Sequence, residues 1–190
     1  MIKNIIDYIS KYIQLDSEEI KAVNELISIK EFKKGTLLLK EGDISKYAYF
    51  NIKGCVRLFS MVEGIGKTTH FYTENQFVTS IKSFTKKVPA NHYLECIEDC
   101  VLGVFSSESE RQLLNKFPKF EYLSRILLEE ELGTYQDILT TYITTSPEER
   151  YKNLLKLKPE LFQRIPQYHL ATYLGITPQS LSRIRSRIVF

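Results

Sequence analysis

The chain has 190 residues, of which 43% are hydrophobic and 26% charged, a composition ordinary for a globular protein of one large domain or a medium domain plus a small one. The formal net charge is +3 and is unevenly distributed. No stretch approaches the roughly twenty apolar residues of a membrane span, and the first residues show an early acid and no small-residue cleavage site. We therefore expect a cytoplasmic protein with no membrane partner.

Two helices are predicted at the start of the chain, at residues 2–13 and 17–28. The second follows Asp16, a residue type that caps helices, and its first turn holds Glu18 and Glu19. Acidic side chains are favourable there because the unpaired backbone N–H groups make this end of a helix positive.

Short β-strands are predicted from Ile29 to Phe105. Turn signals, most of them with glycine, recur in this part at intervals of about ten residues. The β-prone runs between the turns are Thr36–Leu39, Tyr47–Ile52, Val56–Met61, Thr68–Tyr72, Tyr93–Ile97 and Val101–Phe105. Regular short strands with glycine-rich turns indicate a sandwich or a barrel.

The three cysteines, Cys55, Cys96 and Cys100, all fall in this strand-rich part. Their spacing matches no zinc or iron–sulfur pattern. Cys96 and Cys100 lie four residues apart, which would bring them side by side on a helix but not in the strand-rich context expected here. We expect buried, reduced thiols and no metal.

The pattern becomes helical again after residue 106, with a short helix expected at 107–117 and a long one from 119 to about 144. The apolar residues of the long helix recur at intervals of three and four and are Phe120, Leu123, Leu127, Tyr135, Ile138, Leu139 and Tyr142. A helix of about 25 residues is roughly 38 Å long, which is unusual for a lone surface helix in a small protein. Part of its apolar stripe should therefore pair with a second copy of the chain. The alternative is a helix packed wholly on its own barrel.

A further helix is predicted at 147–157. Ser146 would cap it, Pro147 occupies its first turn, and two acids follow beside the positive helix end. The domain boundary therefore falls near Thr145.

The last thirty residues hold the strongest functional signal. Residues 161–190 contain four arginines and no lysine, aspartate or glutamate, so they carry +4 and leave about −1 of the total +3 for residues 1–160. This local basic character favours a polyanion partner at one end of the chain. The alternative is an ordinary basic face in contact with solvent.

Residues 167–185 show the pattern of a helix, a tight turn and a second helix. Gly175 lies where the first helix must stop, Thr177 can cap the second, and Pro178 occupies its first turn. The apolar residues that face inward are Leu170, Ala171, Leu174, Leu181, Ile184 and Ile188. The second helix starts with small, polar residues and bears arginines, which suits the DNA major groove, where Gln reads adenine and Arg reads guanine.

A helical cap, a β-roll, a long helix and a C-terminal helix–turn–helix, in this order, resemble the Crp/Fnr superfamily of bacterial transcription regulators. The best-matched parts are Gly35–Asp43, Tyr49–Leu58 and Leu170–Arg187, and Gly42 and Gly54 match the turn glycines of the roll. The resemblance implies an α+β fold with an N-terminal double-stranded, jelly-roll-like β-roll flanked by helices.

The resemblance also implies three parts. They are a sensor roll similar to cyclic-nucleotide-binding domains at 1–117, a connecting and dimerisation helix at 118–145, and a helix–turn–helix DNA-binding domain at 146–190. A homodimeric, sequence-specific transcription regulator that is not an enzyme is therefore expected. Its expected partners are double-stranded DNA and a second copy of the chain, with RNA polymerase as a further candidate. Two-fold symmetry would place two reading helices about one helical turn apart on DNA.

By this analogy Pro178, Gln179 and Arg183 take the base-reading positions of the family. The residues expected to contact DNA are Tyr168, Thr177, Pro178, Gln179, Ser180, Ser182, Arg183, Arg185 and Arg187. The chain ends at Phe190, so the β-wing of the family is not expected, and the last arginines would supply more of the backbone affinity.

The predicted effector site departs from the family pattern. Cyclic-nucleotide binders of the family carry a Gly-Glu pair and, further along, an Arg that neutralises the cyclic phosphate, and a gapless match puts Thr79-Ser80 and Ala90-Asn91 at these positions. A desolvated arginine that pairs with phosphate is typically worth several kcal/mol. We therefore expect an effector other than cyclic AMP. The candidate pocket residues are Phe77, Thr79, Ser80, Lys82, Ala90, Asn91 and His92.

The identity of the effector stays open. The lysines of this segment, together with His92, could hold another anion, or they could belong to an exposed, solvated loop. Residues 1–30 hold no cysteine, so the oxygen-sensing cluster of some relatives is not expected, and His70 or His92 alone is weak evidence for a haem ligand. No cofactor is expected.

Two rival functions remain open. The chain could be a small-molecule sensor or protein-interaction module whose C-terminal helices do not read DNA. An enzyme with cupin-like metal chemistry would need clustered His and Glu on barrel strands, whereas the sequence holds only His70, His92 and His169 and shows no nucleophile–base arrangement. No catalytic residue is predicted.

Overall fold

Two structural units make up residues 1–188, the part of the chain that the computed structural model describes. The first unit consists of residues 1–58 and 71–128, and the second of residues 59–70 and those from 129 onward. The division into three parts expected from the sequence stays a prediction, and its last two residues lie outside the described ones. Among the described residues, no helix combines the length and the apolar character needed to cross a membrane.

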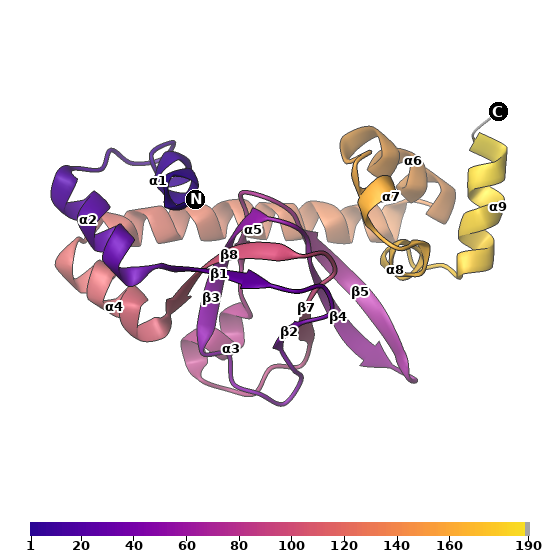
Figure 1. Ribbon diagram of the computed structural model, residues 1–190. Helices are drawn as coiled ribbons and strands as arrows, with labels where there is room; N and C mark the ends of the chain where they lie inside the picture. The colour runs from indigo at the N-terminus through magenta and orange to yellow at the C-terminus, as the bar shows by residue number, and fades with distance from the viewer. Residues whose placement is uncertain (189–190) are drawn as a thin grey trace. The chain divides into compact units, whose positions relative to one another are not determined.

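The elements follow one another as helices, then strands, then helices (Figure 1). The strands are β1 (Ser28–Phe32), β2 (Leu37–Leu39), β3 (Tyr47–Lys53), β4 (Val56–Val62), β5 (Ile65–Tyr72), β6 (Phe77–Val78), β7 (Tyr93–Cys96) and β8 (Cys100–Ser106). The helices are α1 (Ile2–Ile9), α2 (Ser17–Leu26), α3 (Ile81–Lys86), α4 (Ser107–Lys116), α5 (Lys119–Thr144), α6 (Pro147–Leu157), α7 (Leu161–Arg164), α8 (Gln167–Tyr173) and α9 (Pro178–Ile188).

A β-roll of two four-stranded sheets forms the centre of the first unit. One sheet has the strand order β1-β8-β3-β6 and the other the order β2-β7-β4-β5. Strands β1 and β3 pair antiparallel with the two edges of β8, in registers that include Ile29↔Gly103 and Phe50↔Gly103. The α+β fold with a β-roll expected from the sequence is confirmed.

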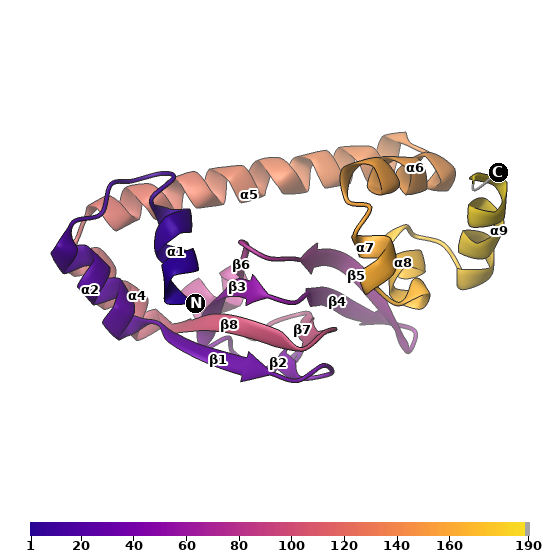
Figure 2. The same cartoon turned by 45° about the horizontal axis from the view of Figure 1, so that its top comes forward.

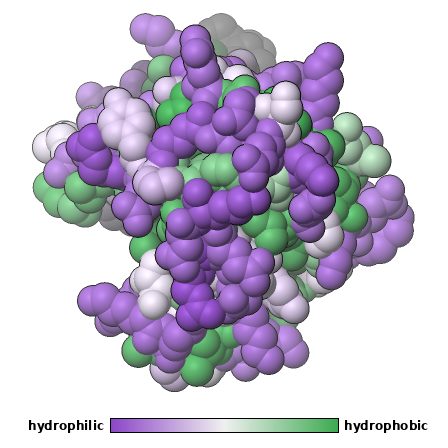
Figure 3. All heavy atoms as spheres, turned by 90° about the vertical axis from the view of Figure 1, so that its left-hand side faces the viewer, coloured by the Kyte–Doolittle hydropathy of each residue, from purple (hydrophilic) through white to green (hydrophobic). Residues whose placement is uncertain are grey.

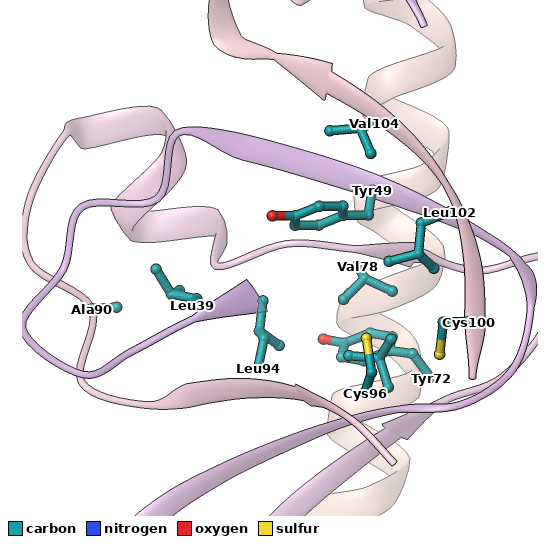
Figure 4. Packing of buried hydrophobic residues seen from close by; sticks show 11 residues of the cluster. Leu39, Tyr49, Tyr72, Val78, Ala90, Leu94, Cys96, Cys100, Leu102 and Val104 are labelled. Carbon is teal, nitrogen blue, oxygen red and sulfur yellow. The ribbon is translucent and has the colours of Figure 1, made fainter. Parts of the chain in front are cut away.

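The alternation of side chains along β3 separates two apolar clusters. Tyr49 packs inside the roll, whereas the next residue, Phe50, packs against helices on the outer face. The inner cluster, whose side chains from the two sheets meet in Figure 4, is Leu39, Tyr49, Val56, Tyr72, Val78, Ala90, Leu94, Cys96, Cys100, Leu102 and Val104. Burying one leucine such as Leu94 completely contributes about 1.5–3 kcal/mol. The predicted burial of all three cysteines is confirmed, and none of the three is in a disulfide.

Helices α1 and α2 and the start of α5 cover the outer face of β3. Their buried residues are Ile5, Ile9, Val23, Phe120 and Leu123. The start of α2 is fixed as its sequence predicts, because Asp16 Oδ1 accepts from the Glu19 backbone N–H at 2.9 Å while Glu19 Oε2 accepts from that of Asp16 at 2.8 Å. Figure 3 shows the side of this unit that bears α2 and α4, where hydrophilic side chains predominate.

Helix α5 is confirmed over its predicted range, and Figure 2 shows it without interruption. Helix α6 likewise begins as predicted, with a reciprocal pair of hydrogen bonds between Ser146 and Glu149. The apolar centre of the second unit comes from α6 to α9 and contains Tyr151, Leu154, Leu161, Ile165, Leu170, Ala171, Leu174, Leu181 and Ile184.

The predicted boundary between the second helix and the first strand was wrong. The helix predicted at 17–28 ends at Leu26, and Ser28–Phe32 forms strand β1. Ile27 already has extended backbone angles, and the free edge of β8 supplies the hydrogen bonds that a further helical turn would have made internally. The short elements β6, α3 and α7 were also missed, because two to six residues carry too little periodicity to be recognised.

We predict that Gly54→Ala will destabilise the roll much more than Gly42→Ala. Both glycines have positive φ, +99° and +87°, so both substitutions carry a backbone strain of about 1–2 kcal/mol. A Cβ at Gly54 would also lie 2.7 Å from Cys100 Sγ and 2.8 Å from the Asp99 carbonyl oxygen, whereas one at Gly42 would meet nothing within 4 Å. The free energy of unfolding in urea should fall by about 1–3 kcal/mol more for the Gly54 variant. Equal losses would contradict this account.

Candidate functional site

The turn between α8 and α9 is built by backbone hydrogen bonds that close the end of α8. The Gly175 N–H donates to the Thr172 carbonyl at 3.1 Å, and the Ile176 N–H donates to the Ala171 carbonyl at 2.9 Å. This is the Schellman arrangement, in which the residue after the helix cap adopts a left-handed conformation. Gly175 does so with φ of +71°. A Cβ at this position would also overlap the Tyr142 hydroxyl.

The start of α9 is capped by Thr177, as its sequence predicts. Thr177 Oγ1 accepts from the Ser180 backbone N–H at 3.2 Å, and Pro178 occupies the first helical position. Leu181 is fully buried and Ile184 is 7% exposed, so one face of α9 packs on the second unit. The opposite face is therefore free to contact another molecule.

The exposed face of α9 brings together three of the residues predicted to contact DNA. Gln179, Ser182 and Arg183 are exposed and lie at helical spacing on the side opposite Leu181. Arg185 is half-buried and lies at the flank of this face rather than on it. Sequence reasoning missed Ser186, which shares the face of Gln179 and Arg183 because it follows them at i+7 and i+3. Its hydroxyl donates to the Arg183 carbonyl at 3.0 Å.

Three of the other predicted contact residues lie at the start of α9, and Tyr168 lies on α8. Thr177 and Pro178 are exposed at the start of α9, and Ser180 is half-buried there. Tyr168, near the start of α8, is 57% exposed, and its ring lies 3.9 Å from that of His169 between centroids.

Arg187 already has an acidic neighbour. Its Nη1 lies 3.6 Å from Glu148 Oε2 at the start of α6, and Lys152 Nζ lies 2.8 Å from the other oxygen of that carboxylate. Lys152, followed by Arg187, holds the pKa of Glu148 below its ordinary value. All three groups face solvent, so salt weakens these pairs. Arg187 is therefore partly neutralised in the free protein, whereas α9 itself contains no acidic residue.

The outer part of the β4–β5 hairpin belongs to the same unit and packs on α8. Thr68 and Thr172 are joined by a hydroxyl–hydroxyl hydrogen bond of 2.9 Å, and Thr172 Oγ1 donates to the His169 carbonyl at 2.9 Å. His70, farther along β5, contacts the Tyr135 ring at 5.7 Å between centroids. Burial, and then the nearby Lys158, lower the pKa of His70 to about 4, so this ring is neutral at pH 7.

The candidate effector residues of the first unit fall into two groups. Phe77 on β6 packs among the rings of Tyr8, Phe50 and Phe105. Ala90 is held by its backbone, because its carbonyl accepts from the Gly42 N–H at 2.8 Å. These two residues thus have clear packing roles.

The polar members of the set show an unusual feature. Thr79 Oγ1 and His92 Nε2 are buried and have no hydrogen-bond partner. His92 Nδ1 lies 3.0 Å from Asn91 Oδ1, and burial lowers the pKa of His92. A neutral His92 then carries its proton on Nδ1, which leaves Nε2 as an acceptor. Ser80 is buried and Lys82 is exposed.

By the gapless sequence match, Ser80 and Ala90 would stand at the two positions of a cyclic-phosphate pair, and neither carries a charge; this alignment stays a prediction. Among residues 1–188, no three His, Cys, Asp or Glu side chains are grouped so that they could hold a metal ion.

Comparisons with known proteins agree with this architecture. Residues 29–117 match the family model of the cyclic nucleotide-binding domain. No curated protein matches the chain significantly. Solved structures of bacterial regulators share the fold.

The c-di-GMP-responsive global regulator CLP from Xanthomonas campestris matches with a TM-score of 0.72 at 17% identity over 91% of each chain. FixK2 from Bradyrhizobium japonicum matches with a TM-score of 0.71 at 16% identity over 85% of this chain and 84% of its own. A regulator of the Crp/Fnr family from Eubacterium rectale matches with a TM-score of 0.72 at 14% identity over 91% and 83%. At these identities the likeness shows the fold alone.

Proposed function

We propose that the chain is a homodimeric, sequence-specific DNA-binding transcription regulator of the Crp/Fnr type, whose effector is not cyclic AMP. One observation carries this proposal: Gln179, Ser182 and Arg183 are exposed on one face of a capped, acid-free helix whose other face is buried. A helix of this kind fits the major groove, which is about 12 Å wide. The likeness to regulators of the same fold supports it.

The chemistry of the face suggests a division of labour. Gln179 and Arg183 carry the side chains that make bidentate contacts to adenine and guanine. Arg187, at the far end of α9, carries a charge suited to phosphate, and on DNA a phosphate would replace Glu148 as its partner. Tyr168 at the start of α8 offers a hydroxyl for a backbone contact.

Substituting the two arginines separates these roles. Arg183→Ala should cost about 1–3 kcal/mol on the preferred sequence and little on scrambled DNA. Arg187→Ala should weaken binding to both alike and reduce the slope of log K against log salt by about one unit. Fluorescence anisotropy with a duplex selected from a random pool, and with a scrambled duplex, measures both. If Arg183→Ala left the selected duplex bound as before, the base-reading assignment would be wrong.

The rival function is a sensor or protein-interaction module. It predicts that the unmodified protein selects no sequence from a random pool. It also predicts that the protein is not retained on DNA at low salt. The same selection therefore decides between the two functions. Contact with RNA polymerase and a cytoplasmic location stay predictions.

Dimerisation is proposed from the exposed stripe of α5. Leu132, Leu139 and Ile143 are 60%, 61% and 72% exposed, and they lie on one side of the helix. Large apolar side chains aligned in this way on an exposed helix are costly unless a partner covers them. A second α5 is the simplest partner, because the same stripe on both copies can form a coiled-coil seam about a two-fold axis.

An acid in the stripe should break the dimer. Leu139→Asp would place two carboxylates in an apolar seam, and we expect a monomer in sedimentation equilibrium at concentrations where the unmodified chain is dimeric. Thr134→Asp is the matched control, since Thr134 is exposed on the other side of α5. Loss of the dimer in both variants would point to a damaged helix instead of an interface.

An effector other than cyclic AMP is proposed from the segment that holds the candidate pocket residues, Phe77 to His92. Thr79 Oγ1 and His92 Nε2 are polar and buried without a partner, and such groups favour a ligand that can bond them. No arginine stands where a cyclic phosphate would need one. An effector would act by shifting the population between arrangements of the reading helices.

Isothermal titration with cyclic AMP should give no heat of binding, because without the arginine the phosphate would lose its hydration and gain no counter-charge. The DNA affinity should not change when cyclic AMP is added. Since one protein of the same fold responds to c-di-GMP, that nucleotide is the comparison titrant. Micromolar binding of cyclic AMP that tightens DNA binding would overturn this part of the proposal.

A further inference from the structure

The guanidinium of Arg150, near the start of α6, donates to three backbone carbonyls at the ends of two other helices, Tyr142 in the last turn of α5, Thr145 just after α5 and Leu174 just after α8. Its Nη1 donates to the Tyr142 carbonyl at 3.1 Å and to the Thr145 carbonyl at 2.5 Å. Its Nε and Nη2 donate to the Leu174 carbonyl at 3.2 and 3.1 Å. One side chain therefore joins the end of α5, the start of α6 and the end of α8.

The electrostatic reason for this arrangement is the convergence of two helix ends. The last carbonyls of a helix have no partner within it and carry a partial negative charge. Tyr142 lies in the last turn of α5, and Leu174 is the cap residue of α8. Arg150 places one positive charge near both helix ends. It also donates hydrogen bonds to carbonyls that would otherwise lack protein donors.

The position of Arg150 in its own helix opposes the usual preference. Glu148 and Glu149 stand where acids favour the positive start of α6, and Arg150 follows them in the next position. A cation there is unfavourable for α6 itself. A residue that conflicts with its local helix is explained by what it contacts elsewhere, and here those contacts are the carbonyls of α5 and α8.

Two further contacts, both made by Tyr142, link the end of α5 to Arg150 and to the α8–α9 turn. The Arg150 guanidinium lies 4.5 Å from the centre of the Tyr142 ring, an arrangement that attracts a cation to an aromatic face. The hydroxyl of the same tyrosine lies so close to Gly175 that no Cβ could fit there. The turn that sets the direction of α9 is thus held from one side by Arg150 and limited from the other by Tyr142.

We propose that Arg150 is a positioning residue for DNA reading, because it fixes the α8–α9 turn to the end of α5 and so sets the direction in which α9 presents Gln179 and Arg183. The inference rests on the proposed DNA-binding function. It assigns the role to a residue that does not itself lie on the exposed face of α9. A misdirected α9 would still attract phosphate through its arginines but would lose the alignment that base contacts need.

Lysine cannot replace arginine in this role. The guanidinium carries five N–H donors in a fixed plane, and four hydrogen bonds to three carbonyls use that geometry. An ammonium group is a compact point charge whose donors cannot span acceptors on two helices at once. Arg150→Lys therefore keeps the charge and loses the connection.

The test compares Arg150→Lys and Arg150→Ala with Arg111→Ala, which removes an exposed arginine on α4 in the first unit. Binding to the selected and the scrambled duplex is measured by anisotropy below the unfolding temperature of every variant, and dimerisation is followed by sedimentation. For both Arg150 variants we expect at least about a tenfold loss on the selected duplex. Affinity for the scrambled duplex and the dimer should be unchanged. Arg111→Ala should bind like the unmodified chain.

Two results would overturn the proposal. One is unchanged affinity of both Arg150 variants for the selected duplex. The other is an equal loss on the two duplexes, which would mean that Arg150 stabilises the fold or adds charge but does not direct α9. If Arg150→Ala does not fold, Arg150→Lys, which retains the charge and most of the volume, decides by the same criteria.

Amide hydrogen exchange separates failure of this proposal from failure of the proposed function. In Arg150→Lys, protection should fall together at residues 143–146 and 175–177 and stay unchanged in the roll. If the unmodified chain selects no sequence, the DNA-binding function is wrong, and this exchange pattern alone reports whether Arg150 holds the turn. Unchanged exchange at both segments would show that it does not, whatever the chain binds.

Discussion

The need to satisfy backbone groups at helix ends is the constraint on which the rest of the second unit depends. Four N–H groups and four carbonyls at each helix lack an internal partner, and the short helices α6 to α9 of this unit are joined by tight connections. Ser146, Thr177 and the Gly175 turn meet this need locally. Arg150 meets it across three helices at once. The direction of α9 follows from how these ends are closed.

Charge is distributed so that the two units have different chemical characters. The acid-free α9 concentrates positive charge on an exposed face, with Glu148 beside Arg187 as the nearby acid that a phosphate would displace. Ser80 and Ala90, which the sequence match assigns to the cyclic-phosphate positions, carry no charge, and two buried polar atoms of the same segment, Thr79 Oγ1 and His92 Nε2, have no hydrogen-bond partner. A regulator with this pairing would bind DNA through charge and read its effector through neutral hydrogen bonds.

Elements with strong local signals were predictable from the chain alone. Helices α5 and α6 have the bounds expected from their apolar spacing and caps. Both signals are local, because apolar residues recur every three or four positions along α5 and the Ser-Pro-Glu-Glu start of α6 involves four consecutive residues. The Gly175 turn was predictable for the same reason, since only glycine readily adopts a left-handed backbone. Strand β1 was not, because its hydrogen bonds come from β8, more than sixty residues away.

The sequence by itself determined the order of the elements, the caps and turns, and which end of the chain is basic, since these depend on neighbours along the chain. Only the tertiary structure decided which residues share a face or a partner. It packed Phe77 against Tyr8 and Phe50 and brought the Leu174 carbonyl to Arg150. Such contacts join residues far apart in sequence, and no local propensity encodes them.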